Sequence, residues 1–224
     1  MSIEVPRGVH PQEDNLARTQ DLAARLATID PLLDNLSLFF GINKPSESLP
    51  PGQLIREMTL EDWRIRYEKG IVGPALGSRI GFWNRKKPLT DQAFGFNGKY
   101  NVREDISPNN FFATRNSIPP TLIDPAILNA IVEAFVDSFD ANRADVICMD
   151  STYEKANEPI QSLYMLWLDE DAPYPIAGED FRLRADHPPP SHSEPWLGGT
   201  RYIWPEHEPR AWLGLDPEES GDGG

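Results

Sequence analysis

The sequence predicts an α+β fold: one domain in which a mostly antiparallel sheet of about five to seven strands packs against several helices, with long Pro-rich loops. Three observations predict it. Apolar residues recur at helical spacing in some segments and alternate with polar residues in others, and 22 of the 224 residues are prolines. We expect the domain over residues 13–215, between an extended N-terminal arm (residues 1–12) and a disordered, acidic, Gly-rich tail (residues 216–224).

The first helix is expected from Asp14 to about Ile29. From Asp14 the apolar pattern follows helical spacing, with Leu22, Leu26, Ile29 and Leu33 at i, i+4, i+7 and i+11. Pro31 has no amide hydrogen and clashes with a preceding helical turn, so the helix must end before it. A short apolar run, residues 36–42, is compatible with a helix or a strand. The prolines and the glycine of residues 45–52 then predict a loop.

Thr59 begins a second predicted helix, Leu60–Lys69. The threonine side chain and the carboxylate of Asp62 have the spacing of a capping box, and Gly70 favours termination. Three strand-like segments follow, with the polar and apolar alternation of an antiparallel meander. They are Arg79–Asn84, Gln92–Val102 and Asn110–Asn116.

The clearest predicted helix runs from Pro125 to about Phe139, with Asp124 as N-cap and Pro125 at the first helical position. Three further strands are expected after it: Asp145–Met149, Ser162–Leu168 and Arg201–Trp204. The segment between the last two, residues 172–195, holds six prolines. We expect these prolines to exclude a strand there, because proline cannot donate to a ladder.

Charge is distributed unevenly along the chain. The formal net charge is −14, which excludes a uniformly basic nucleic-acid-binding protein. Residues 140–224 hold 18 acidic and 6 basic side chains, whereas residues 1–139 hold 17 and 15. The acidic excess suits either a solvated face that keeps the protein in solution or a docking surface for a basic partner.

The sequence lacks the common catalytic and cofactor-binding motifs. It contains no His-Glu-x-x-His pair, no Gly-x-Ser-x-Gly elbow, no phosphate loop and no dinucleotide fingerprint. Cys148, the single cysteine, lies in an apolar run that predicts a buried core residue. We therefore expect no catalytic residue, no cofactor and no resident metal. No segment reaches the roughly 18 apolar residues of a membrane span, so we expect a cytoplasmic protein without a membrane partner.

Two groups of residues leave alternatives open. Loop carboxylates and imidazoles could hold a metal ion in a small metal-dependent hydrolase, with Asp169, Asp171, His187 and His192 as the ligands. Four aromatic residues lie close together near the C-terminus, and they suit either a contact surface or a satellite core under the long loop. These aromatic residues are Trp196, Tyr202, Trp204 and Trp212.

Four places in the chain carry a family resemblance. They are the segment Leu-Ala-Ala-Arg-Leu-Ala-Thr-Ile-Asp-Pro-Leu-Leu at 22–33; Ile-Gly-Phe-Trp-Asn at 80–84 with the following Gly98–Asn101 region; Ser-Phe-Asp at 138–140 with Ala144–Met149; and Trp196–Trp204. In content and order they resemble the immunity protein 52 family, small proteins that protect bacteria from their own secreted polymorphic toxins. Gly198, Gly199 and the long proline loop before them depart from the family pattern.

The resemblance implies a mixed α+β fold, no catalysis and a cognate toxin partner. That toxin is typically a restriction-endonuclease-like nuclease effector, delivered by a contact-dependent route such as type VI secretion. The family supplies no interface residues, so we predict these from charge and aromatic character. The predicted contact residues, which would bind the toxin and not nucleic acid, are Asp169, Glu170, Asp171, Glu179, Asp180, Trp196, Glu206 and Glu208. Besides the toxin-binding protein and the metal-dependent hydrolase, a third hypothesis remains: a structural adaptor without a toxin partner.

Overall fold

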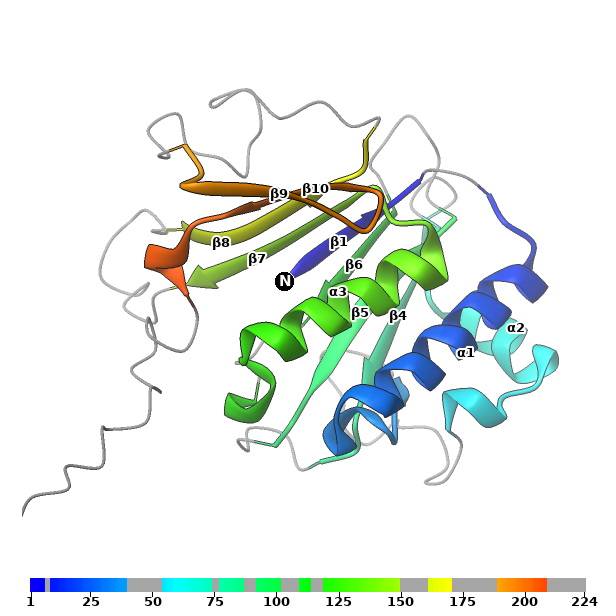
Figure 1. Ribbon diagram of the computed structural model, residues 1–224. Coiled ribbons are helices and arrows are strands. Elements are labelled where there is room, and N and C mark those ends of the chain that lie inside the picture. The colour runs from blue at the N-terminus through cyan, green and yellow to red at the C-terminus, as the bar shows by residue number, and fades with distance from the viewer. Residues whose placement is uncertain are drawn as a thin grey trace, which may run out of the picture.

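The structure, a computed structural model, describes residues 1–6, 9–39, 54–73, 77–86, 92–101, 109–113, 119–149, 161–170 and 189–208. In these segments, ten strands form one antiparallel sheet, and helices α1 (Gln12–Ile29) and α3 (Pro125–Phe139) lie across one of its faces (Figure 1). Helix α2 (Leu60–Lys69) packs beside α1. The predicted α+β class is therefore confirmed. The predicted tail, residues 216–224, lies outside the described residues.

The strand order in the sheet is β2-β4-β5-β6-β1-β7-β8-β10-β9, and β3 pairs with β4 beside β2. The strands are β1 Ser2–Val5, β2 Ser37–Phe39, β3 Ile71–Gly73, β4 Gly77–Trp83, β5 Gly95–Tyr100, β6 Asn109–Ala113, β7 Arg143–Met149, β8 Gln161–Leu168, β9 His192–Trp196 and β10 Gly199–Ile203. Short 3₁₀ turns complete the described part: η1 Pro31–Leu33, η3 Ile55–Glu57, η4 Pro120–Leu122 and η6 Pro205–His207.

The N-terminal residues form part of the sheet, which corrects the prediction of an arm outside the domain. Strand β1 lies in the middle of the sheet and pairs with β6 on one side and β7 on the other. Ile3 and Val5 are buried, whereas Ser2 and Glu4, which alternate with them, are partly exposed. This alternation is the signature of a strand with one buried face. Four residues are too few for periodicity to reveal it in the sequence.

The ten strands exceed the predicted five to seven because short strands escaped the sequence criteria. The undecided run at residues 36–42 contains β2. Strand β9 contains Pro195 and corrects the expectation that no strand forms before residue 196. Proline is tolerated there because β9 is the last strand in the sheet order, where a missing amide hydrogen need not break the ladder.

A tight turn joins β9 to β10 and explains the pair of glycines there. Leu197 and Gly198 both have positive φ, 50° and 77°, as a two-residue type I′ hairpin requires. A Cβ atom at Gly199 would collide with the carbonyl oxygen of Leu168 in β8. Gly198 therefore serves the turn, and Gly199 permits the close approach of β10 to β8.

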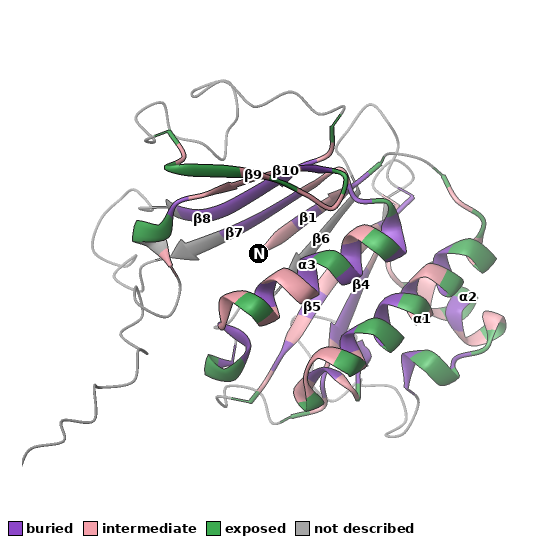
Figure 2. Ribbon diagram, viewed as in Figure 1, coloured by how far each residue is buried: buried purple, intermediate pink, exposed green. Residues whose placement is uncertain are grey.

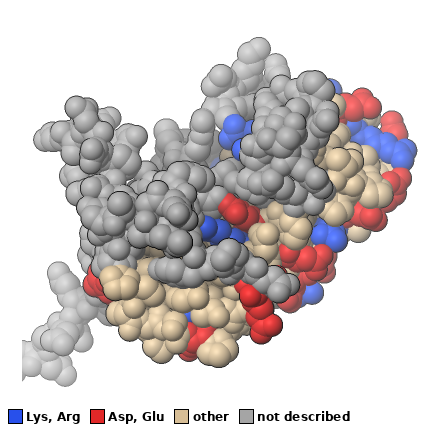
Figure 3. Space-filling model, turned by 90° about the horizontal axis from the view of Figure 1, so that it is seen from above, with Lys and Arg blue, Asp and Glu red and all other residues tan. Residues whose placement is uncertain are grey.

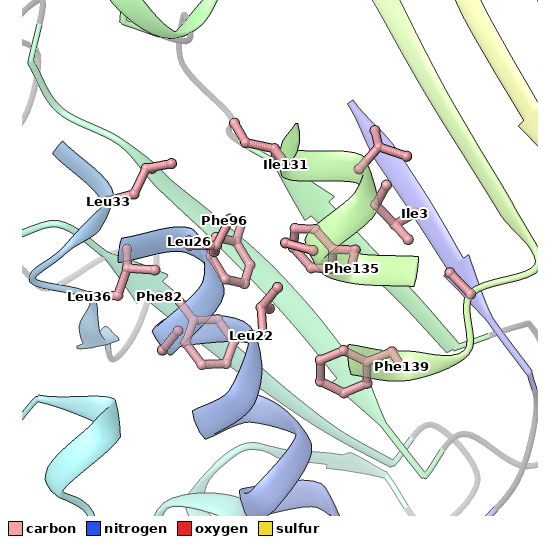
Figure 4. Packing of buried hydrophobic residues seen from close by; sticks show 14 of the residues in the cluster. Ile3, Leu22, Leu26, Leu33, Leu36, Phe82, Phe96, Ile131, Phe135 and Phe139 are labelled. Carbon is pink, nitrogen blue, oxygen red and sulfur yellow. The ribbon is translucent and has the colours of Figure 1, made fainter. Parts of the chain in front are cut away.

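The main core fills the space between the two long helices and the sheet. Leu22 and Leu26 of α1 and Phe135 of α3 point toward the sheet, where Phe96 and Phe82 meet them (Figure 4). The rings of Phe82 and Phe96 stack at 4.6 Å between centroids, and Phe96 meets Phe135 edge to face at 5.5 Å. Buried residues line the helix faces toward the sheet, and exposed residues line the outer faces (Figure 2).

Local capping fixes two helices where the sequence predicts them. The backbone amide of Asp62 donates to Thr59 Oγ1 at 3.2 Å, and the amide of Thr59 donates to Asp62 Oδ2 at 3.1 Å, which completes the predicted capping box. At the start of α3, the amide of Ala126 donates to Asp124 Oδ1 at 2.8 Å.

Within the described segments, no helix has both the length and the apolar character to cross a membrane.

Candidate functional site

The predicted contact residues fall at two ends of the sheet. Asp169 and Glu170 follow β8 next to the β9–β10 turn, and the Asp169 amide donates to the Asn142 carbonyl at 3.1 Å. Glu206 lies in η6, beyond the other end of β10. Four residue steps of β10 alone separate the two ends by about 13 Å, and Figure 1 shows the turn and η6 on opposite sides. The predicted surface is thus two separate patches.

We call the first patch the turn-end patch and define it as Asp169, Glu170 and Trp196. Trp196 pairs with Gly199 across the hairpin, and Gly199 lies against Asp169. The second patch, which we call the η6 patch, consists of Glu206 and Glu208 around η6. Three other predicted contact residues, Asp171, Glu179 and Asp180, lie outside the described residues.

Trp196 is half-buried and held in place by its neighbours. Its carbonyl oxygen accepts a hydrogen bond of 2.8 Å from the indole nitrogen of Trp167. The guanidinium of Arg201 lies over its ring, 4.6 Å from the centroid, and also pairs with Glu194. The hydrogen bond and positive charge of Arg201 lower the pKa of Glu194. The ring is therefore preoriented at the tip of the hairpin.

The other described tryptophan of this aromatic group belongs to a core. Trp204 is fully buried against Leu163, Leu166 and Leu168 of β8, and its amide donates to the Tyr164 carbonyl at 2.9 Å. Tyr202 packs against the same cluster while partly exposed. The satellite-core reading is correct for Trp204, and Trp212 lies outside the described residues.

Part of the acidic excess after residue 139 is paired with arginines within the described part of the chain. Of the 18 acidic side chains after residue 139, seven are in described residues. Three of these pair with arginines: Asp140 with Arg18, Asp145 with Arg143 and Glu194 with Arg201. Seen from above, basic and acidic side chains are interspersed over the described surface (Figure 3).

Two residues proposed as ligands of one metal ion lie too far apart for that role. His192 pairs with Ile203, which in turn pairs with Met165 of β8. Asp169 lies four residues further along the chain than Met165, a displacement of about 13 Å along the strand, whereas ligands lie about 2 Å from a shared metal ion. Asp171 and His187 lie outside the described residues. Within the described segments, no cluster of three or more His, Cys, Asp or Glu side chains could hold a metal ion.

A small hollow near the C-terminal end of α3 was not predicted from the sequence. Its volume is about 80 Å³. It is lined by residues from β1, the segment before α1, α1, β5 and the end of α3: Val5, Pro6, His10, Asn15, Arg18, Lys99, Tyr100, Asn101, Phe139 and Asp140. These residues come from three separate stretches of the chain, 5–18, 99–101 and 139–140, so only the folded protein brings them together.

Buried amides form the frame of the hollow. Asn101 has a positive φ of 57°. Its Oδ1 accepts a hydrogen bond of 2.9 Å from the His10 amide, and its Nδ2 donates to the His10 carbonyl at 3.1 Å. Asn15 Nδ2 donates to Asn101 Oδ1 at 3.2 Å. Beneath them the Tyr100 hydroxyl lies 2.9 Å from Thr19 Oγ1, and burial raises the pKa of Tyr100 strongly. The frame is therefore rigid and internally satisfied.

Comparisons with known protein-family models and with curated proteins find no match to this chain. The segments that carry the family resemblance have structural positions in the fold. Leu22, Leu26 and Leu33 are core residues, as are Phe82 and Phe139. Their positions account for the α+β architecture and leave the function to be argued from the surface.

Proposed function

We propose that this protein is an immunity protein that binds and neutralises a cognate secreted bacterial toxin, a restriction-endonuclease-like nuclease effector. The observation that carries the proposal is the turn-end patch. A preoriented, half-buried Trp196 ring lies at the same end of the sheet as the carboxylates of Asp169 and Glu170. Rigid aromatic rings beside charged groups supply much of the energy in protein interfaces, because they bury large areas with few rotamers to fix.

The charge of the protein suits such a partner. A nuclease presents positive charge to its substrate, and a net charge of −14 draws that surface toward this protein. Asp169 and Glu170 are adjacent carboxylates at this end of the sheet, and the Glu170 amide donates to Asp169 Oδ1 at 2.8 Å. The proposed contact set also keeps five acidic residues that are chosen for their charge in the sequence alone: Asp171, Glu179, Asp180, Glu206 and Glu208. Bound in the cytoplasm, the protein would occupy the groove that otherwise accepts nucleic acid.

Co-expression with the product of a neighbouring toxin gene tests the proposal. We expect restored growth of cells that express the toxin, and co-purification of the two proteins as one complex. A triple variant of the turn-end patch, Asp169→Lys, Glu170→Lys and Trp196→Ala, should lose rescue. The matched control reverses Glu61, an exposed acid on α2, to lysine and should rescue as the parent does. Toxicity that persists in the presence of the parent protein would refute the proposed function.

A further inference from the structure

The α3-end hollow, defined by the ten lining residues given above, carries two cations in a protein with a strong negative net charge. Arg18 and Lys99 line it together with the imidazole of His10, and Asp140 contributes the one carboxylate among the described lining residues. Asp140 is already paired with Arg18 at 3.1 Å, and its side chain is 74% exposed. An exposed pair of this kind is weak and easily shared with another anion.

Arg18 is positioned to bind a planar anion. One of its terminal nitrogens, Nη1, donates to the carbonyl of Phe139 at 3.4 Å, and the other meets Asp140. These two contacts orient the guanidinium at the mouth of the hollow. A guanidinium fork matches the oxygens of a carboxylate or of a phosphate.

The backbone of His10 is fixed, but its imidazole is not engaged. Asn101 and Asn15 bond to both the amide and the carbonyl of His10. The imidazole itself forms no hydrogen bond or ion pair with the described residues. A ring fixed at its backbone and open at its nitrogens is preorganised to donate to an incoming oxygen.

The floor and the volume limit the size of the ligand. The rings of Tyr100 and Phe139 lie 6.3 Å apart and, with Val5, give the hollow a buried apolar floor. The volume of about 80 Å³ exceeds the roughly 10–15 Å³ that one water molecule requires. It accommodates a carboxylate on a body of one or two carbon atoms, with the apolar end on the floor and the oxygens toward Arg18.

From these observations we propose that the α3-end hollow is a binding site for a small free monocarboxylate, held by Arg18 and His10 at its oxygens and by Tyr100 and Phe139 at its apolar end. The site lies on residues outside the turn-end patch. The proposal therefore does not depend on the toxin-binding function, and either can fail without the other.

Titration of the isotopically labelled full-length protein with sodium acetate, followed by nuclear magnetic resonance, tests the proposal. Sodium chloride at equal ionic strength serves as the reference. We expect saturable shifts of the His10 backbone amide and of the side-chain amides of Asn15 and Asn101. Methylammonium, which has a similar size and the opposite charge, should not shift them. Linear, unsaturated shifts, or binding of methylammonium in place of acetate, would overturn the proposal.

Two variants locate the site. Arg18→Gln should weaken acetate binding by about tenfold or more, because it removes charge-assisted hydrogen bonds. Lys99→Gln should weaken it as well and leaves the Arg18–Asp140 pair in place. The control, Arg64→Gln, removes a cation that pairs with Glu13 and does not line the hollow, so affinity should be unchanged. Equal affinity in all three variants would show that acetate binds elsewhere and would contradict the site.

Discussion

Arg25 of α1 and Asp137 of α3 form an ion pair, with Nη1 and Oδ2 2.6 Å apart. The same guanidinium donates through Nε to Asp21 Oδ2 at 2.8 Å, and this carboxylate also accepts the Ser138 hydroxyl at 2.7 Å. These four side chains connect the outer edges of the two long helices above the core. They link the two long helices, and Asp140, which lines the hollow, directly follows α3.

We call this group of four side chains, Asp21, Arg25, Asp137 and Ser138, the α1–α3 clamp. It predicts how the free energy of unfolding depends on pH. Burial raises the pKa of Asp21, but hydrogen bonds from Ser138 and Arg25 outweigh burial, so the net pKa is lowered. A carboxyl group with a lower pKa in the folded state stabilises the protein above its unfolded value of about 3.9, and that contribution is lost as pH falls through the folded pKa. Asp21→Asn should therefore lose less stability between neutral and acidic pH than the parent.

Urea unfolding of both proteins at neutral pH and near pH 3 measures this difference. Because Asp21 is 47% exposed, we expect the difference to remain below about 1 kcal/mol. Glu61→Gln, an exposed substitution on α2, should follow the parent at both pH values. Identical acid dependence in Asp21→Asn and the parent would mean that the clamp does not contribute.

Removal of the central aromatic ring should cause the largest loss of stability. Phe96 contacts Phe82 in the sheet and Phe135 in α3, and it is 3% exposed. Phe96→Ala should reduce the free energy of unfolding by about 3–5 kcal/mol, because it leaves a cavity between sheet and helix. Ile65→Ala on the exposed side of α2 should cost less than about 0.5 kcal/mol. Similar unfolding midpoints for the two variants would contradict the assigned core.

The two glycines of the β9–β10 turn should respond differently to substitution. Gly199→Ala places a methyl group against the Leu168 carbonyl, so it must push β10 away from β8 and lower the melting temperature. Gly198→Asn should be tolerated, because asparagine accepts positive φ and no atom lies within 4 Å of a Cβ there. Thermal unfolding distinguishes them. A larger loss for Gly198→Asn than for Gly199→Ala would contradict the hairpin geometry.

The turn-end patch and the η6 patch should contribute unequally to toxin binding. Trp196→Ala removes a preoriented ring and should raise the dissociation rate of the complex by about tenfold or more. Glu206→Lys changes charge at the opposite end of β10 and should affect dissociation much less. Surface plasmon resonance on the purified pair measures both rates. A greater effect at Glu206 would move the contact surface to the other end of the sheet.

The sequence predicts helices α2 and α3 at their observed bounds because their ends are encoded locally. Thr59 and Asp124 cap the first turns, and the apolar stripes extend over ten residues or more. Strand β1 was missed because its identity depends on partners more than a hundred residues away. The presence of Pro195 argued against β9, and only its position at the sheet edge makes that strand possible.

The candidate site was harder to predict because it depends on strand register. Asp169 and Glu206 appear equivalent in a charge count, yet the pairing of β8 with β10 places them at opposite ends. Trp196 and Trp204 are similar residues eight positions apart, but one lies at the hairpin tip and the other in a core. The hollow joins three distant parts of the chain, residues 5–18, 99–101 and 139–140, and no local pattern marks it.

The kinetics of binding to the toxin encoded by a neighbouring gene test the central claim most directly. The claim is that this protein acts by covering a basic toxin surface with carboxylates and a fixed aromatic ring. Stopped-flow measurements should show a stable complex whose association rate falls about tenfold between about 0.05 and 0.3 M salt, while dissociation changes little. Failure of the two purified proteins to form a complex at any ionic strength would contradict the account.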